Sequence, residues 1–244
     1  MNIIKLDATE STNSFLKELS VNSQLSNFTV VVTDKQTSGR GQMNTKWISE
    51  PNKNLLSSIY ITLSDYPIHK QVYLNFAIAI AIHEGLSHFE LPDLEIKWPN
   101  DILSGKKKVC GILIENILKG NKIDASIVGF GININQQNFP PEIPNADSIK
   151  NITGKTVQVE DVLFEIVKKI EEKVFLLSTG KYDVLNDEYH KVLHKKNTPS
   201  MFKDDKGVVF MGKILKVDTS NGKLLIELAD ETIRSFHLKE VLFI

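Results

Sequence analysis

Along this chain, runs of β-branched residues alternate with segments in which apolar residues recur at helical spacing. Four runs rich in valine and isoleucine predict buried strands, at Phe28–Thr33, Leu55–Leu63, Val109–Asn116 and Ile123–Phe130. Lys119-Gly120-Asn121 separates the last two runs, so they are expected to form a hairpin. Apolar residues at helical spacing predict helices within 9–20, 70–89, 162–174 and 182–193. Because strands and helices interleave, the pattern predicts an α/β (α+β) fold with a central mixed sheet flanked by helices.

The pattern changes after Lys195. Short alternating segments at 208–217, 223–228 and 232–236 are separated by polar turns. This arrangement predicts a small antiparallel β-barrel. We therefore expect two domains, residues 1–195 and residues 196–244. Two polar segments, Lys35–Lys53 and the proline-containing Asn138–Ser148, are expected to be loops.

Composition limits the kinds of partner that the protein is expected to bind and the compartment in which it is expected to lie. The 244 residues include 29 basic and 30 acidic side chains, a balance that argues against chain-wide attraction to nucleic acid or an anionic membrane. Cys110 is the single cysteine, so an internal disulfide is impossible, which fits a reducing cytoplasm. The amino terminus lacks the pattern of a secretory signal, and the apolar Ala77–Ile82 is too short to span a bilayer. A cytoplasmic protein with no membrane partner is expected.

The segment from Gln36 to Trp47 carries the strongest chemical signal. Gly39 and Gly41 allow backbone N–H groups to approach a ligand closely, and Arg40 between them offers a planar donor fork to a phosphate or carboxylate. A surface hairpin with a charged tip is the alternative for this segment taken alone. Neither of the usual glycine-rich nucleotide motifs is present, so a nucleotide would be held in another way.

Three further segments combine polar groups with strand ends. Several functional side chains lie close together in Lys97-Trp98-Pro99-Asn100-Asp101, where a proline ends a strand. A charged surface turn explains this segment equally well. Lys108 enters an apolar strand that contains Gly111, and it could neutralise charge at a phosphate. Gly129–Asn135 places small residues and amides at a strand end, where a β-bulge is the alternative.

Other candidate groups do not form a site. His190 and His194 have the spacing of helical metal ligands, but Lys191 stands where a metalloprotease needs glutamate, and no third ligand is near in sequence. Cys110 lies in an apolar strand and is interpreted as a core residue.

Taken together and in this order, these segments resemble the biotin–protein ligase family, of the monofunctional type. The resemblance implies a catalytic domain like that of class II aminoacyl-tRNA synthetases, followed by a small C-terminal β-barrel. It also implies a two-step reaction with ATP and Mg²⁺. Biotin is first converted to biotinoyl-5'-AMP with release of pyrophosphate. The biotin is then transferred to a lysine of a biotin carboxyl carrier protein domain.

The resemblance also assigns residues. Lys108 and Arg40 would be the catalytic cations, and Asp101 would be a candidate ligand of Mg²⁺. The adenylate would contact Trp47, Asn100, Asn133 and Lys108. The residues expected to bind biotin are Ser11, Thr12, Asn13, Gln36, Gly39, Arg40, Gly41, Gln42, Lys108 and Gly111.

Two departures from the family pattern change the expectations. Gln42 stands where many members carry a second arginine, so this site should hold the intermediate less tightly. Few residues precede Ser11, which leaves no room for a helix-turn-helix domain, so binding to DNA through one is not expected. A homodimer formed through a sheet edge stays open. A lipoate ligase or octanoyl transferase of the same fold, and a non-catalytic biotin sensor, are the alternative functions.

Overall fold

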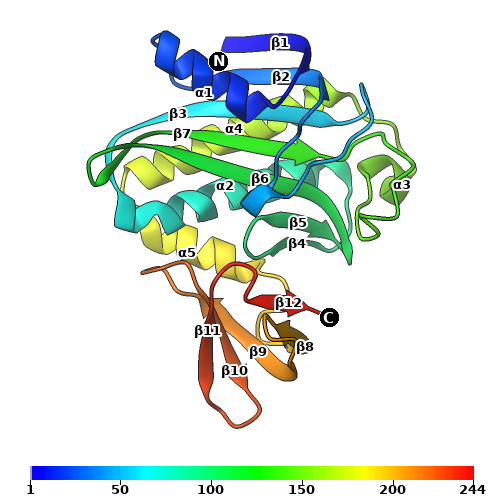
Figure 1. Cartoon of the computed structure of the whole chain (residues 1–244), viewed down its shortest axis with the longest axis vertical. Coiled ribbons are helices and arrows are strands. Elements are labelled where there is room, and N and C mark those ends of the chain that lie inside the picture. The colour runs from blue at the N-terminus through cyan, green and yellow to red at the C-terminus, as the bar shows by residue number, and fades with distance from the viewer. Residues whose placement is uncertain (1) are drawn as a thin grey trace.

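A seven-stranded mixed sheet dominates the computed structural model, which describes residues 2–244 (Figure 1). The strand order is β1-β2-β3-β7-β6-β5-β4, and β1 and β2 are parallel while the other neighbours are antiparallel. This confirms the predicted mixed sheet. The strands are β1 Asn2–Thr9, β2 Thr29–Gln36, β3 Leu55–Pro67, β4 Leu94–Lys97, β5 Asp101–Ser104, β6 Lys107–Lys119 and β7 Lys122–Ile132.

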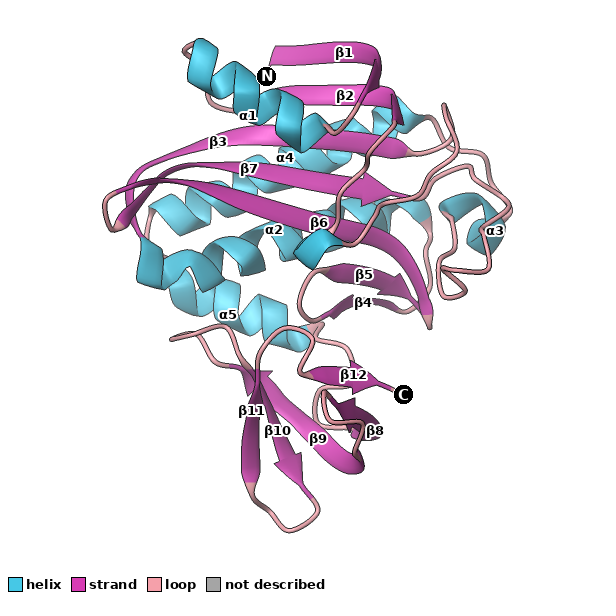
Figure 2. Cartoon of the chain, in the orientation of Figure 1, coloured by secondary structure: helices cyan, strands magenta, loops and turns pink. Residues whose placement is uncertain are grey.

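Helices cover both faces of this sheet (Figure 2). They are α1 Thr12–Asn22, α2 Gln71–Leu86, α3 Ile149–Thr153, α4 Val159–Ser178 and α5 Tyr182–Lys191. Side chains alternate across a strand, and β2 shows the consequence. Val31 packs with Leu16 of α1, whereas Val30 belongs to the larger core, which includes residues of α2, α4 and α5.

Helix α2 is buried over most of its surface, with Gln71 and Asn75 exposed, so the interpretation of residues 70–89 as a helix with one apolar face was too narrow. The predicted apolar positions Val72, Phe76 and Ala79 are buried, but so are Leu74 and Ile78 on other sides of the helix. Such a helix lies between two layers, here the sheet and the pair α4 and α5. Among the described residues, no helix combines the length and apolar character needed to cross a bilayer.

The C-terminal part forms a second, five-stranded sheet, which confirms that the strands predicted there are antiparallel. Its strands, in the order β11-β10-β9-β8-β12, are β8 Pro199–Asp204, β9 Val209–Val217, β10 Leu224–Leu228, β11 Ile233–Phe236 and β12 Val241–Phe243. Phe202, Ile214 and Phe236 are buried in its core. The boundary expected at residue 195 falls between α5 and β8, and it stays a prediction.

Hydrogen bonds attach the second sheet to the first part of the chain. The Trp98 indole N–H donates to the carbonyl of Gly222 at 3.1 Å, and the Val217 N–H donates to His190 Nε2 at 2.9 Å. The connecting segment also pairs with the outer strand β4, where Ile96 N–H donates to Val192 O at 2.8 Å. These contacts bring β12 beside β4 and β5 (Figure 1), so residues near the C-terminus can reach the strand ends of the larger sheet.

Candidate functional site

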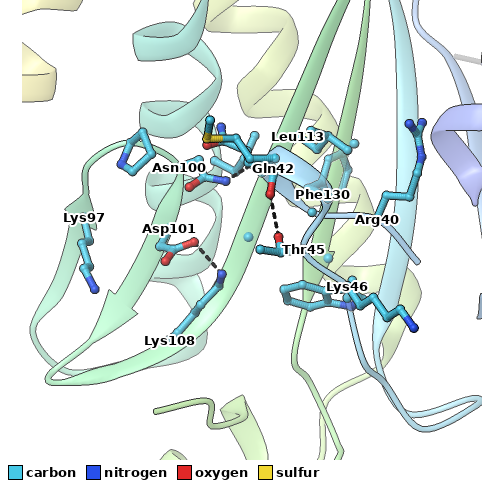
Figure 3. A pocket seen from close by; sticks show the side chains of 18 of the residues that line it. Arg40, Gln42, Thr45, Lys46, Lys97, Asn100, Asp101, Lys108, Leu113 and Phe130 are labelled. Atoms are coloured by element: carbon cyan, nitrogen blue, oxygen red, sulfur yellow. Dashed lines mark hydrogen bonds and ion pairs between the residues drawn. The ribbon is translucent and has the colours of Figure 1, made fainter. Parts of the chain in front are cut away.

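One cavity of about 470 Å³ collects most of the residues expected to act (Figure 3). It lies where the larger sheet meets the C-terminal sheet. Of the predicted site residues it is lined by Ser11, Thr12, Asn13, Gln36, Arg40, Gly41, Gln42, Trp47, Asn100, Asp101, Lys108 and Gly111. Gly39 and Asn133 are not among its lining residues. Arg40 and Lys108, which are distant in sequence, therefore share one cavity.

The cavity is strongly cationic. Its lining includes five basic side chains, those of Arg40, Lys46, Lys97, Lys108 and Lys239. Asp101 is the only acidic residue found in the lining among the described residues. Such an excess of positive charge in a concave site favours anionic ligands such as carboxylates and phosphates.

The glycine-containing segment forms a tight turn at the cavity. Gly41 N–H donates to Thr45 O at 2.7 Å, and Trp47 N–H donates to Gly39 O at 2.9 Å. A Cβ at Gly39 would lie 2.7 Å from the carbonyl oxygen of Trp47, so the close pairing of the turn requires glycine there. Lys239 of the C-terminal part donates from Nζ to Met43 O at 3.1 Å, which ties the turn to the second sheet.

Arg40 points away from Lys108, toward the opposite end of the cavity (Figure 3). Its NH2 atom lies 2.7 Å from Oε2 of Glu115, and its NH1 atom lies 3.3 Å from Oε1. Glu115 is on β6 and was missed by the sequence analysis, because a glutamate at a strand position carries no local signal of a partner in a distant loop. The guanidinium is thus held by a carboxylate at the side of the cavity.

A chain of polar contacts connects the expected biotin residues to that pair. Thr12 N–H donates to Gln36 Oε1 at 2.9 Å, and Ser58 Oγ lies 2.7 Å from Thr12 Oγ1 and 2.6 Å from Asn13 Oδ1. Asn13 Nδ2 then donates to Glu115 Oε2 at 2.8 Å. All these groups but Gln36 and Glu115 are buried. Buried polar groups joined in this way have few alternative rotamers, so the end of the cavity is rigid before a ligand arrives.

Trp47 lies flat against the sheet because two strands carry glycine beneath it. Gly111 on β6 and Gly131 on β7 are cross-strand partners. A Cβ at Gly111 would lie 2.9 Å from the Trp47 ring, and a Cβ at Gly131 would overlap the same ring. The indole therefore forms a wall of the cavity, as expected for a residue that contacts a planar group.

Lys108 and Asp101 form an ion pair at the other end of the cavity, with Nζ 2.6 Å from Oδ1 (Figure 3). Both residues are on neighbouring strands, β6 and β5. Asn100 supports the same corner, since its Nδ2 donates to Ile112 O at 2.7 Å and its backbone O accepts from Ile112 N–H at 2.9 Å. The Lys-Trp-Pro-Asn-Asp segment thus turns β4 into β5 beside Lys108.

Lys97 and Phe243 are further residues that the sequence analysis did not assign. The Lys97 Nζ lies 5.1 Å from the centre of the Phe243 ring, and both residues line the cavity. Burial lowers the pKa of Lys97, while the nearby Asp101 carboxylate acts in the opposite direction. Because Phe243 belongs to the last strand, only the packing of the two sheets places it here.

Asn133 does not line the cavity, and its side chain is bonded to the backbone instead. It is 2% exposed, and its Nδ2 donates to the backbone carbonyls of Asp147 at 3.1 Å and Lys108 at 3.4 Å. It therefore joins the segment of the predicted loop 138–148 to the start of β6. Through this contact Asn133 supports the backbone from which Lys108 extends.

The groups set aside in the sequence stay outside the cavity. His190 of α5 packs against β9 and accepts from the Val217 N–H. Cys110 is fully buried, and this burial raises the pKa of its thiol well above the ordinary value. Within residues 2–244 no group of three or more His, Cys, Asp or Glu side chains is arranged to hold a metal ion.

Comparison with known proteins gives a consistent set of relatives. Residues 6–133 match the model of the biotin/lipoate A/B protein ligase family. The chain is 30% identical to the bifunctional ligase/repressor BirA of Bacillus subtilis, over 98% of this chain and 73% of that protein. It is 34% identical to the BirA of Bacillus spizizenii over 70% of this chain, but the match spans only 53% of that relative. A biotin protein ligase from Aquifex aeolicus, solved with biotin and ATP, superposes with a TM-score of 0.80 at 27% identity, covering 99% of this chain and 97% of that one.

Proposed function

Because the chain belongs to the biotin/lipoate A/B protein ligase family, we propose that it is an ATP-dependent biotin–protein ligase. It converts biotin and ATP to biotinoyl-5'-AMP and pyrophosphate, then transfers biotin to a lysine of a biotin carboxyl carrier protein domain. The proposal rests on one observation: among the described residues, the lining of the first cavity contains five basic side chains and one acidic one. A carboxylate and a triphosphate repel each other, and only a cationic site can bring them into contact.

Lys108 is the residue proposed to act at the reacting atoms. In the first step the carboxylate of biotin attacks the α-phosphorus of ATP, and negative charge increases on the phosphate oxygens. The ammonium of Lys108 stabilises this charge, and Asp101 fixes its position through the 2.6 Å ion pair. Asn100 and Asn133 hold the two backbone segments beside it. No covalent intermediate on the protein is needed.

The biotin end is proposed to lie against the rigid polar chain of Ser11, Thr12, Asn13 and Gln36, under the turn that contains Gly39, Gly41 and Gln42. Arg40, held by Glu115, anchors this turn and supplies positive charge at the side of the cavity. Trp47 and Gly111 form the wall and floor between the biotin and adenylate parts.

Magnesium is proposed to enter with the triphosphate. Mg²⁺ is commonly bound by one or two carboxylates together with substrate phosphates. Asp101 is the acidic side chain of the cavity lining that would hold the ion, through the carboxylate oxygen that is not paired with Lys108. Its single carboxylate fits an ion carried by the nucleotide.

Biotin-dependent exchange of pyrophosphate into ATP tests the function. The ligase predicts exchange with biotin and none with lipoate or octanoate, which separates it from a lipoate ligase or octanoyl transferase of the same family. Binding of biotin without any exchange would instead indicate a sensor. The homodimer stays an open alternative, which sedimentation measurements would decide. The expected lack of DNA binding stays a prediction, which mobility-shift measurements would check.

A further inference from the structure

A second cavity, of about 320 Å³, opens behind strand β6. Gly111 and Leu113 of this strand line the first cavity, whereas Ile114 and Asn116 line the second. Because side chains alternate across a strand, the two cavities lie on opposite faces of β6. The far wall of the second cavity comes from α2, α5 and the turn between β9 and β10.

The two cavities meet around the edge of β6. Strand β5 pairs with β6 only as far as Gly111, so the edge beyond that residue is not covered by β5. The cavities have six lining residues in common, Gln42, Trp98, Pro99, Asn100, Ile112 and Leu238. A group that enters the second cavity would therefore arrive beside Asn100, at the edge of the cavity where the adenylate is proposed to form.

The second cavity differs from the first in charge. Among the described residues, its lining contains no lysine, arginine, aspartate or glutamate. Its polar side chains are mostly amides, such as those of Gln71, Asn75 and Asn116, and its apolar walls include Phe76 and Ala79. Its titratable side chains are His237 and Tyr189. Such a lining does not favour pyrophosphate or a nucleotide, because it offers no lysine or arginine to an anion.

We propose that this second cavity receives the side chain of the acceptor lysine, an inference that rests on the proposed ligase function. An aliphatic stem with a terminal amine suits a slot with apolar walls and amide oxygens at its rim. Burial without a neighbouring carboxylate lowers the pKa of an ammonium group, which favours the neutral amine that can react.

The transfer step begins with the acceptor lysine in its ammonium form. The entering ammonium loses one proton to solvent, and the neutral nitrogen attacks the carbonyl carbon of biotinoyl-5'-AMP. A C–N bond forms as the bond between that carbon and the phosphate oxygen breaks, and AMP leaves with the electron pair. The second proton leaves the nitrogen as the amide forms. Two separate cavities allow the amine to approach while biotin and adenylate still occupy the first.

Asn75→Trp tests this assignment. Asn75 is an exposed residue of α2 that lines the second cavity but not the first. The larger tryptophan side chain would therefore block the second cavity without entering the core. We expect transfer to a purified biotin carboxyl carrier protein domain to slow about tenfold or more. Biotin-dependent pyrophosphate exchange should stay within about twofold of the wild type. Asn22→Trp, on an exposed site of α1, is the matched control and should change neither rate.

A second variant tests the charge argument without added bulk. Asn75→Asp would place a carboxylate in the slot, stabilise the ammonium form of the acceptor lysine, and move the pH dependence of transfer upward. Normal transfer by Asn75→Trp, equal losses of exchange and transfer, or an unshifted profile for Asn75→Asp would overturn the assignment. If the wild type shows no biotin-dependent exchange, the ligase function itself fails, which is a distinguishable result.

Discussion

Arg40 on the glycine-containing turn and Glu115 on β6 form a two-point ion pair, with NH2 and Oε2 2.7 Å apart. Glu115 also accepts from Asn13 at 2.8 Å. One carboxylate therefore connects the turn to the rigid polar end of the cavity. The guanidinium thus holds the turn in place, while Gly39 allows the close approach of the Trp47 carbonyl within it.

Glu115→Gln should weaken biotin binding. The amide can still accept from Asn13 but cannot pair with the charge of Arg40, so the turn is less firmly held. Because the pair is partly exposed, we expect the KM for biotin in pyrophosphate exchange to rise only about threefold to tenfold, with a smaller change in kcat. If the ion pair is the cause, the double variant Arg40→Met, Glu115→Gln should be no worse than either single variant. Additive losses would show that the two residues act independently.

Lys108→Ala should abolish most adenylate formation. Removing one group that stabilises charge in a transition state typically slows the reaction about 10²- to 10³-fold. The measurement is biotin-dependent pyrophosphate exchange at saturating substrates. Lys106→Ala, in the exposed turn before the same strand, is the matched control and should retain wild-type activity. An activity of Lys108→Ala within a few-fold of the wild type would remove this lysine from the mechanism.

Gln42→Arg should slow release of the intermediate. Gln42 lines the junction of the two cavities and carries no charge, so it offers biotinoyl-5'-AMP no charge-assisted contact. An arginine there would add one. The rate of release can be followed after single-turnover formation of labelled intermediate, with Gln42→Met as an uncharged control of similar length. Unchanged or faster release from Gln42→Arg would refute the explanation.

The stability of the protein should decrease in mildly acidic solution because of His190. Burial lowers the pKa of this imidazole below its usual value of about 6.5, and its Nε2 accepts from the Val217 N–H. The depressed folded-state pKa means that the unfolded chain binds the proton more readily. His190 therefore stabilises the fold above about pH 6.5, and this contribution is lost as the pH falls through the folded-state pKa.

The free energy of unfolding, measured by denaturant at several pH values, checks this expectation. His190→Phe removes the titrating group, keeps a ring against Phe76, and loses the hydrogen bond to Val217. It should be less stable than the wild type near neutral pH but should show a smaller decline from pH 7 to pH 5. Equal declines in both proteins would exclude His190 as the source.

Local patterns predicted the long elements well and the short ones poorly. The β-branched runs of β2, β3, β6 and β7 and the helices α2, α4 and α5 were all expected. Strand β1 was missed because none of its residues is fully buried and its sequence is mixed. Strands β5 and β12 span only four and three residues, so their pairing partners, rather than their own sequence, make them strands.

For the candidate site, sequence alone was sufficient to select the segments of Gln36–Trp47, Lys97–Asp101 and Lys108, because their residue types and order carry a chemical pattern. It could not reveal Glu115 or Phe243 as neighbours of these segments, nor that Asn133 supports a backbone rather than lining the cavity. Those relationships depend on register and on the packing of two sheets, and the residues that meet are up to 196 positions apart, as are Met43 and Lys239. Composition and spacing describe what a side chain can do, whereas long-range packing decides which partner and which cavity it meets.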